Sequence, residues 1–406
     1  MNIALLTREF PPDTVWGGQA RTYHDLARGL KELGHEVHVI CQGIDGARSY
    51  LEQGMFVHKV GGYVKQWSVL SRADYAVRAW LKLQDIIRKH NIEVVDSVSD
   101  GTDTLLYSLH RQTPLVVQVH GSIRGALKTS TYSKIHGLEV RTLLKSSDYV
   151  LRRADRVIAI SPVAYEEVLE ESKINSKKVH LIYLPIDVQK YHYVESDVRE
   201  KFGIIDSNAM VLFVGRLERR KGVHTLCEAM PIIARSFPKT KFVFIGKDIG
   251  GAPDGGPFTS YIMKTAAEHA MAEDILFYPH VSHDDLLKLY SASDVVVCPS
   301  LHEIASSVPM EAMACGKPVV ATPTGIASEL IDDNRGAIVP VEDAKALAAE
   351  TIRILKSMKS TPNLKDAIAK RNREAMEERC SITRMASEVA EVYKEAIKGK
   401  TTNEHR

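Results

Sequence analysis

The strongest constraint on the fold is the alternation of short apolar segments with longer amphipathic ones along the 406-residue chain. Apolar runs of about five residues are typical of buried strands, and the segments between them repeat apolar residues at the helical period. Parallel strands need a long crossover connection, usually a helix, and such crossovers are right-handed. The alternation therefore predicts an α/β fold built from parallel sheets.

The alternation runs as two series, separated by a polar segment without a predicted strand, Leu184 to Glu200. The first series gives predicted strands at 2–6, 36–40, 92–96, 115–119, 156–160 and 179–183, and predicted helices at 17–33, 69–90 and 137–153. The second series gives predicted strands at 210–214, 241–245, 275–278, 294–298, 318–321 and 337–339, and predicted helices at 223–236, 261–271, 284–291 and 365–397. Each series is typical of a doubly wound, Rossmann-like sheet.

We therefore predict two such domains, residues 1–190 and 191–380, followed by a C-terminal segment at 381–406. A chain of this length is too long for one ordinary domain and suits two of about 150–200 residues. Ligands of doubly wound sheets bind outside the carboxyl ends of the strands. We expect the two domains to face each other across a deep cleft that holds the ligand.

The segment Cys298 to Val320 carries two carboxylates around a predicted helix start. A helix N-terminus presents free N–H groups and partial positive charge, which suit a phosphate. Glu303 precedes this helix, and Glu311 lies about one turn inside it, among small and apolar residues. Because burying a carboxylate without a partner is unfavourable, we expect both to face ligand hydroxyls. A phosphate flanked by hydroxyls indicates a sugar nucleotide.

The basic loop at 215–222, GRLERRKG, follows one predicted strand and precedes a helix. Its four cations within six residues favour a nearby anion, which a diphosphate would supply. Arg216 and Lys221 each stand beside a glycine, so we predict that they bind this diphosphate. Arg219 and Arg220 suit a solvent-exposed turn.

Two features of the first half also lie where strands end. Gly17 and Gly18 follow the first predicted strand and open a helix, so the backbone there can approach a phosphate or a sugar closely. A simple tight turn is the alternative interpretation. His120 follows the strand at 115–119, where it could donate a hydrogen bond to a sugar hydroxyl, or could merely pack.

Composition argues against several other classes of protein. A net charge of +2 gives no indication of nucleic-acid binding. The sequence shows neither a signal peptide nor an apolar run long enough to span a bilayer. Five scattered cysteines without CxxC spacing fit reduced thiols, and not a zinc site or a disulfide framework. We expect a cytoplasmic protein.

Taken together, these motifs resemble the retaining glycosyltransferases of family four, which adopt the GT-B fold. Glu303-x7-Glu311 followed by AMACGKPVVAT resembles the signature of that family, and GRLERRKG resembles its diphosphate loop, G-R-x4-K-G. Gly17-Gly18 resembles its N-terminal glycine loop, and VHG at 119–121 resembles its catalytic-site histidine. The resemblance covers essentially the whole chain, with the motifs of both halves in order.

The resemblance implies a hexosyltransferase that takes a nucleotide-diphosphate sugar as co-substrate, retains the anomeric configuration and uses no other cofactor. The family's donor-binding positions fall on Gly17, Gly18, Arg216, Lys221, Val281 (whose backbone would border the base), Ser307, Val308 and Glu311. Of these, Arg216 and Lys221 would hold the diphosphate and Glu311 the ribose hydroxyls. Glu303 and His120 would be the catalytic-site residues, Glu303 on the donor sugar and His120 near its anomeric centre. The C-terminal helix is expected to cross back to the N-terminal domain.

The chain departs from the family pattern at two places. Ala305-Ser306 stands where the family usually has an aromatic residue and a glycine, and Leu184-Pro185-Ile186-Asp187 replaces Asn-Gly-Val-Asp. Because the charged positions are kept, we expect altered donor-sugar specificity and not loss of activity. No Asp-x-Asp occurs in the sequence, so we expect no metal at the site. Retention by same-face attack is favoured over a covalent intermediate, because Glu303 is not clearly placed as a nucleophile.

From the sequence, two other functions stay open: a sugar-nucleotide epimerase of similar architecture and a catalytically silent sugar-nucleotide-binding protein. The acceptor is predicted to be a sugar, a glycolipid or a small molecule. Residues 121–156 carry eight Lys or Arg against three acids. Such a stretch would suit peripheral contact with the inner face of a membrane, and a solvated helix face is the alternative.

Overall fold

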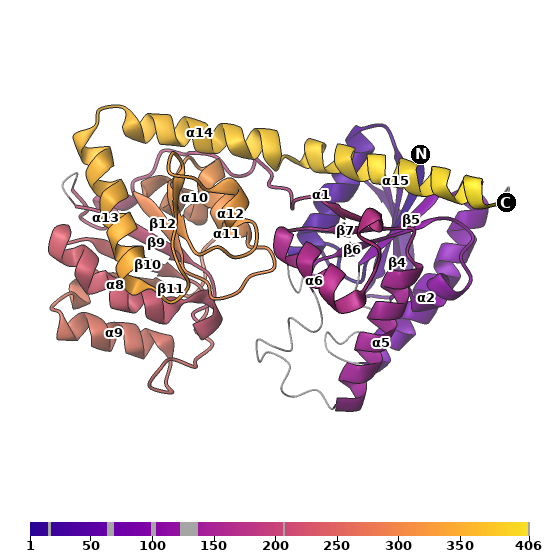
Figure 1. Ribbon diagram of the computed structural model, residues 1–406, viewed down its shortest axis with the longest axis horizontal. Helices are drawn as coiled ribbons and strands as arrows, with labels where there is room; N and C mark the ends of the chain where they lie inside the picture. The colour runs from indigo at the N-terminus through magenta and orange to yellow at the C-terminus, as the bar shows by residue number, and fades with distance from the viewer. Residues whose placement is uncertain (15–17, 63–68, 99–102, 122–136, 206–207, 405–406) are drawn as a thin grey trace. The chain divides into compact units, whose positions relative to one another are not determined.

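The computed structural model describes residues 1–14, 18–62, 69–98, 103–121, 137–205 and 208–404 (Figure 1). The chain divides into two compact units. The N-terminal unit comprises Met1–Pro185 together with Ile382–Arg406, and the C-terminal unit comprises Ile186–Ser381. The sequence-predicted domain limits lie at 190 and 380, and the last helix of the chain belongs to the N-terminal unit.

Within the described residues, the N-terminal unit holds an eight-stranded sheet in the order β3-β4-β2-β1-β5-β6-β7-β8. Its strands are β1 (Asn2–Leu6), β2 (Glu36–Gln42), β3 (Arg48–Glu52), β4 (Met55–Val60), β5 (Val94–Val98), β6 (Leu115–Val119), β7 (Arg156–Ala159) and β8 (Val179–Leu181). Neighbouring strands pair in parallel, except that β3 pairs antiparallel with β4. The chain proceeds outward from β1 on one side and from β5 on the other, so the topological switch point lies between these two strands.

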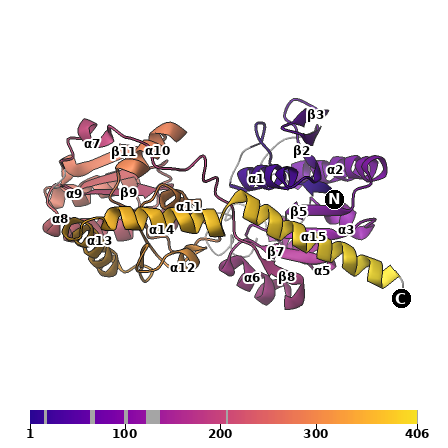
Figure 2. The same ribbon diagram turned by 90° about the horizontal axis from the view of Figure 1, so that it is seen from above.

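Helices cover both faces of this sheet. They are α1 (Gly18–Glu32), α2 (Val69–His90), α3 (Leu105–Leu109), α5 (Gly137–Arg153), α6 (Pro162–Ser172) and α15 (Ile382–Glu404), with a 3-10 turn at Ser176–Lys178. α1 and α15 share one hydrophobic core with the sheet, in which Tyr23 and Tyr393 are fully buried. Figures 1 and 2 show α15 lying along this unit, so the end of the chain completes the first sheet's core.

The C-terminal unit holds, within its described residues, a six-stranded parallel sheet in the order β11-β10-β9-β12-β13-β14. Its strands are β9 (Met210–Val214), β10 (Lys241–Ile245), β11 (Ile275–Tyr278), β12 (Val295–Cys298), β13 (Val319–Ala321) and β14 (Gly336–Ile338). The switch point lies between β9 and β12, from which the chain proceeds outward in opposite directions. The central strands are nearly continuous apolar runs because both of their faces are covered.

The helices of this unit are α7 (Val198–Lys201), α8 (Val223–Ser236), α9 (Phe258–Glu268), α10 (His283–Ala292), α11 (Ser307–Ala314), α12 (Ala327–Leu330), α13 (Ala344–Ser360) and α14 (Leu364–Arg379), with 3-10 turns at Arg219–Lys221 and Ala272–Asp274. α8, α9 and α13 form one core with the sheet. α11 packs against α14, which Figure 1 shows on the side of the sheet away from α8 and α9. Two doubly wound α/β units are thus present, as the sequence predicted.

The helices α3, α6, α7, α12 and α13 were not predicted, and the helical segment predicted at 365–397 is found as two helices, α14 and α15. Two further differences concern strands. The hairpin of β3 and β4 was not predicted, because β3 (RSYLE) is an edge strand whose side chains are largely exposed and lack apolar alternation. The strand predicted at 92–96 is found at Val94–Val98, and its buried polar residues Asp96 and Ser97 hide it from an apolar pattern. Neither difference changes the order of the strands that carry the predicted site.

Candidate functional site

Two loops meet at the switch point of the C-terminal sheet. β9 is followed by residues 215–222, and its neighbour β12 is followed by residues 299–306. Parallel strands end at the same edge of a sheet, so the two loops leave it side by side. The basic loop at 215–222 and Glu303 therefore lie at the same edge of the C-terminal sheet.

Lys221 and Glu303 form the centre of this site. Lys221 Nζ lies 2.6 Å from Glu303 Oε1, and a terminal nitrogen of Arg220 lies 3.1 Å from Glu303 Oε2. The hydroxyl of Ser300 donates a hydrogen bond to Glu303 Oε1 at 3.0 Å. Both oxygens of a buried carboxylate thus have partners.

These contacts decide the charge of Glu303. Burial alone raises the pKa of a carboxyl group, but the charges of Lys221 and Arg220 and the Ser300 hydrogen bond outweigh it and lower the pKa of Glu303. The side chain is therefore a carboxylate at neutral pH. Removing one partner from such a buried pair typically costs about 3–5 kcal/mol.

Glu218 connects the other cations of the basic loop. Arg216 and Arg220 each place a terminal nitrogen near Glu218 Oε1, at 3.0 and 2.9 Å. Arg219 is exposed and pairs with Glu342 at 3.1 Å. The prediction of a solvent-exposed turn holds for Arg219 and is wrong for Arg220, which is largely buried between two loop carboxylates. Sequence reasoning missed Glu218 because only the cations of this loop were considered.

Gly222 allows the two loops to approach. Its φ of 70° lies in the left-handed region, and a Cβ atom at this position would overlap the carbonyl oxygen of Pro299. Next to it, the N–H of Leu301 donates to the carbonyl oxygen of Arg220 at 2.8 Å. A glycine is therefore required where the basic loop meets the loop that carries Glu303.

The helix α11 begins directly after this second loop. Its N-cap residue Ser306 has extended backbone and makes no side-chain capping bond. The half-buried Ser307 and Val308 take the first two helical positions. The first four N–H groups of a helix have no acceptor within it, so those of Ser307 and Val308 suit an anionic ligand.

Glu311 lies further along α11 and is buried. The hydroxyl of Tyr290 in α10 donates to Glu311 Oε2 at 3.0 Å. Burial, together with the nearby charge of Glu311, raises the pKa of Tyr290 well above its ordinary value, so the tyrosine stays a donor. Sequence spacing gives no indication of this partner, because Tyr290 belongs to another helix.

The other predicted donor positions are spread over both units. Val281 is half-buried in the loop after β11, at the same sheet edge as the basic loop. Gly18 is the exposed first residue of α1 in the N-terminal unit, and Gly17 lies outside the described residues. The structure therefore brings Lys221 and Glu303 into contact and joins Arg216 to them through the Glu218 carboxylate.

His120 follows β6 in the N-terminal unit, at the carboxyl edge of that sheet. Its half-buried ring lies 5.7 Å from the ring of Tyr23, measured between centroids. The Tyr23 hydroxyl in turn donates to Asp96 Oδ1 at 2.7 Å. The histidine is thus packed against a tyrosine that is itself held by a buried carboxylate.

Sequence reasoning missed Asp96. This residue of β5 is fully buried and also accepts hydrogen bonds from Gln118 Nε2 and the Tyr393 hydroxyl, both at 2.9 Å. Burial raises the pKa of Asp96 to about 6, although the three donors act in the opposite direction. The one available signal was a carboxylate inside a short strand that is otherwise made of valines and one serine.

The basic stretch at 121–156 is described only from residue 137 onward, apart from Gly121. Within that part, Arg153 Nε donates to the carbonyl oxygen of Ser108 at 2.7 Å, and Arg156 pairs with Glu395 at 3.2 Å. Contact with a membrane through this stretch stays a prediction. In the part of the chain that the structure describes, every helix is too short or too polar to cross a bilayer.

Two family descriptions match the two halves of the chain. Residues 16–190 match "Glycosyltransferase Family 4", and residues 194–374 match "Glycosyl transferases group 1". The chain is 29% identical to an uncharacterized glycosyltransferase of Methanocaldococcus jannaschii, over 98% of this chain and 99% of the relative. It is 26% identical to the alpha-maltose-1-phosphate synthase of Mycolicibacterium smegmatis, over 97% of this chain and 99% of that protein.

Solved structures show the same fold. Sucrose-phosphate synthase from Thermosynechococcus elongatus superposes with a TM-score of 0.76 at 22% identity, over 98% of this chain and 99% of that one. HepE of Anabaena, solved in complex with UDP, gives a TM-score of 0.71 at 20% identity, over 97% of this chain and 100% of that one. Both comparisons extend over the two α/β units.

Proposed function

Since the chain belongs to glycosyltransferase family four and has the GT-B fold, we propose that it transfers a sugar from a nucleotide-diphosphate donor to an acceptor hydroxyl, with retention at the anomeric carbon. The observation that carries the proposal is the cluster of Lys221, Arg220 and Glu303 at the switch point of the C-terminal sheet. This edge is where doubly wound domains bind nucleotides. Anabaena HepE has been solved with UDP-glucose and a plant starch synthase with ADP, which supports a nucleoside diphosphate leaving group.

In the proposed reaction, the bond between the sugar C1 and the diphosphate oxygen breaks, and its electron pair goes to that oxygen. The acceptor oxygen bonds to C1 from the same face, and its proton passes to the departing diphosphate. Negative charge therefore develops on the diphosphate, where Lys221, Arg216 and the first N–H groups of α11 would stabilise it. No metal ion is needed for this step.

The two glutamates are assigned to hydroxyl groups of the donor. Glu311 would accept hydrogen bonds from the ribose, and Glu303 from the transferred sugar, while its pair with Lys221 keeps it ionised. His120 would lie near the anomeric centre. Ala305 and Ser306, which link Glu303 to α11, are the positions we expect to influence which donor sugar is accepted.

A donor screen tests this proposal. UDP-, GDP-, ADP- and TDP-sugars are added to the full chain, and the melting temperature is followed, since a donor at 100 times its Kd stabilises by about 2.7 kcal/mol. The stabilising donor is then incubated with candidate acceptors, with and without EDTA. We expect nucleoside diphosphate release that depends on an acceptor and is unchanged by EDTA, with the donor's anomeric configuration kept in the product.

Other results would redirect the proposal. Isomerised donor without transfer would identify an epimerase, and donor binding without turnover for every acceptor class would identify a silent binding protein. Inverted product would rule out retention, and loss of transfer in EDTA that a divalent ion restores would rule out metal-independent transfer. Glycolipid acceptors are included in the screen.

Peripheral membrane contact through residues 121–156 is a separate part of the proposal. The excess of basic residues there supports electrostatic attraction to anionic lipid. We expect the protein to sediment with anionic vesicles at low salt and to be released as salt rises, since screening weakens the attraction. Equal sedimentation with neutral vesicles would contradict this.

A further inference from the structure

A group of metal-ligating side chains lies at the amino edge of the N-terminal sheet, the edge opposite to His120. Glu36 and His38 are at the start of β2, two residues apart, so their side chains project from the same face of the strand. His90 is the last residue of α2, which packs against β2. A strand and a helix end thus supply three side chains to one place.

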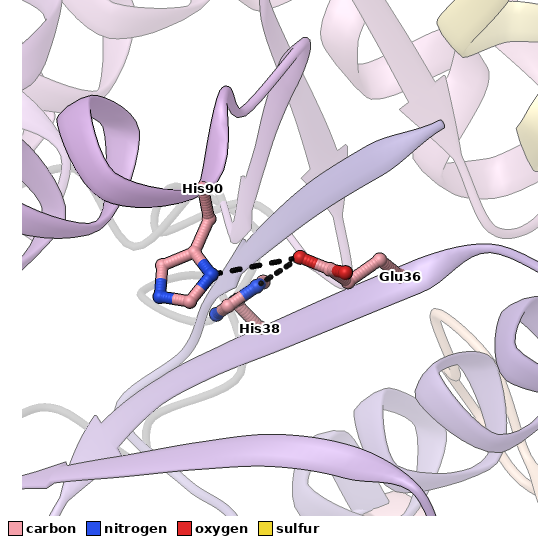
Figure 3. Close-up of side chains that lie close together, drawn as sticks. All are labelled: Glu36, His38 and His90. Carbon is pink, nitrogen blue, oxygen red and sulfur yellow. Dashed lines mark hydrogen bonds and ion pairs between the residues drawn. The ribbon is translucent and has the colours of Figure 1, made fainter.

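The three ligand atoms have the spacing of a small coordination site, as Figure 3 shows. Glu36 Oε1 lies 3.0 Å from His38 Nε2 and 3.6 Å from His90 Nδ1, and the three atoms lie within 4.8 Å of one another. Ligand atoms about 2.0 Å from a tetrahedral zinc ion are about 3.3 Å apart. The two separations from Glu36 bracket that value, and the histidine nitrogens lie within 4.8 Å of each other, so coordination needs only side-chain movement.

Behind His38, a hydrogen-bond chain continues into the sheet. His38 Nδ1 lies 3.1 Å from His58 Nε2, and His58 Nδ1 lies 2.9 Å from the hydroxyl of Ser49, its partner across β3 and β4. Metal-bound histidines nearly always donate their second ring N–H to an acceptor, usually a carboxylate, a backbone carbonyl or water, which fixes the tautomer. Here the acceptor would be His58 Nε2. His38 has this arrangement, with Nε2 directed toward Glu36.

The hydrogen-bond chain that runs from Ser49 through His58 and His38 to Glu36 has two self-consistent proton arrangements. In one, Ser49 donates to His58, His58 donates to His38, and His38 Nε2–H donates to Glu36. In the other, every proton is reversed, and the lone pair of His38 Nε2 faces the Glu36 carboxylate. Two acceptors facing each other require a cation between them, which can be a proton or a metal ion.

We propose that Glu36, His38 and His90 bind one Zn²⁺ ion, with solvent as the fourth ligand. Two imidazoles and one carboxylate suit zinc, whereas Mg²⁺ and Ca²⁺ prefer oxygen ligands throughout. The ion can enter from solvent, because the side chains of Glu36 and His90 are 41% and 35% exposed while that of His38 is fully buried. Bound zinc would join β2 to the end of α2 and stabilise the N-terminal unit.

Metal titration of the full chain tests the proposal. After treatment with a chelator and desalting, Zn²⁺ binding is measured by calorimetry and Co²⁺ binding by visible absorption. We expect one ion per chain, a tetrahedral Co²⁺ spectrum displaced by Zn²⁺, and a higher melting temperature with Zn²⁺. His90→Asn removes a direct ligand, so Zn²⁺ affinity should fall by more than the 10–100-fold typical of an outer partner.

Matched variants separate this site from adventitious binding. His110→Asn changes an exposed histidine of the same unit and should bind Zn²⁺ like the unaltered protein. Glu36→Gln, at a partly exposed position, provides a second test if His90→Asn fails to fold, and should also weaken binding at least tenfold. Zn²⁺ affinity unchanged in a folded ligand variant, or equally reduced in His110→Asn, would show an adventitious ion only.

The proton arrangement gives an independent readout. With ¹⁵N-labelled histidine, Zn²⁺ should move the proton of His38 from Nε2 to Nδ1 and that of His58 from Nε2 to Nδ1. Histidine spectra that do not change at one equivalent of Zn²⁺ would overturn the assignment. Neither the metal titration nor the histidine spectra depend on transferase activity, so the zinc proposal can be disproved while the proposed function stands.

Discussion

Asp96 of the N-terminal unit and Glu303 of the C-terminal unit are both buried near the strands of a switch point, and the two are held in opposite ways. Asp96 on β5 accepts three hydrogen bonds from neutral groups: two tyrosine hydroxyls and one amide. Glu303, in the loop after β12, is bound by Lys221 and Arg220 as well as a serine hydroxyl. Burial raises the pKa of Asp96 to about 6, whereas at Glu303 the two cations and the serine hydroxyl together outweigh burial and lower the pKa.

The difference fits a structural role for Asp96 and the ligand-binding role that we propose for the site around Glu303. The partners of Asp96 come from α1, β6 and α15, so its hydrogen bonds join the last helix of the chain to the first sheet. Apart from Ser300, the partners of Glu303 are long cationic side chains on one loop, and such side chains can bind a phosphate as well as a carboxylate. The first arrangement joins a helix to a core, and the second is the one at which we propose that a charged ligand binds.

The largest expected effect comes from removing the charge at Lys221. If the lysine stabilises a departing diphosphate, Lys221→Ala should lower kcat/KM for the natural donor by about 10²–10³-fold. The same variant should lose most of the thermal stabilisation that the donor gives. Turnover is measured as acceptor-dependent release of nucleoside diphosphate.

Lys241→Ala is the matched control for this prediction. Lys241 is a lysine of the same unit, 17% exposed against 16% for Lys221, and it pairs with Asp274 at 2.7 Å. It stands at the amino end of β10, away from the basic loop, so its loss should leave turnover nearly unchanged. An equal loss of activity in both variants would contradict a specific role for Lys221.

A smaller effect is expected from Asp96→Asn, and it depends on pH. The pKa of Asp96 is raised from 3.8 to about 6 in the folded state, so the folded protein binds more protons than the unfolded chain between these values. The contribution of Asp96 to stability therefore falls as pH rises from about 4 to about 6, by about 3 kcal/mol in total. Asparagine does not ionise, so the variant should lack this decline.

Tryptophan fluorescence makes the measurement specific. The three tryptophans, at positions 16, 67 and 80, all belong to the N-terminal unit, so urea unfolding followed by their emission reports on that unit. At pH 4 the variant should be less stable than the unaltered chain, because the amide cannot accept from all three donors. By pH 7 this difference in stability should close, because the ionisation of Asp96 has by then destabilised the unaltered chain. The exposed Asp45→Asn serves as control, and a parallel pH dependence for Asp96→Asn and the unaltered chain would refute the assignment.

Whether the sequence could predict a contact depends on which strands and helices its residues come from. The strands MVLFV and KFVFI were predictable because their apolar runs are continuous, and the loops after β9 and β12 followed from strand order. The contact between Lys221 and Glu303 needed only the adjacency of those two strands. It was not predicted, because each residue was assigned to a ligand instead.

The partners of Asp96 could not be predicted in this way. Tyr23 and Tyr393 stand at opposite ends of the sequence, and helical periodicity marks both as core residues without revealing that their hydroxyls share one acceptor. The cluster of Glu36, His38 and His90 was hidden for a similar reason, since the spacing between β2 and the end of α2 has no metal-binding signature. Side-chain contacts between elements that are far apart in the sequence can be identified only from the register of the folded structure.

The smallest expected effect is that of Tyr393→Phe, which sharpens the description of Asp96. The variant keeps the ring in the core and removes one of the three donors, so the N-terminal unit should lose about 0.5–1.5 kcal/mol, more where Asp96 is ionised. Because the hydroxyl lowers the pKa of Asp96, its loss should also move the pH-dependent decline to higher pH. Tyr149→Phe, at an exposed position, should change neither quantity. If Tyr393→Phe behaved like this control, the Asp96 carboxylate would have no part in joining α15 to the sheet.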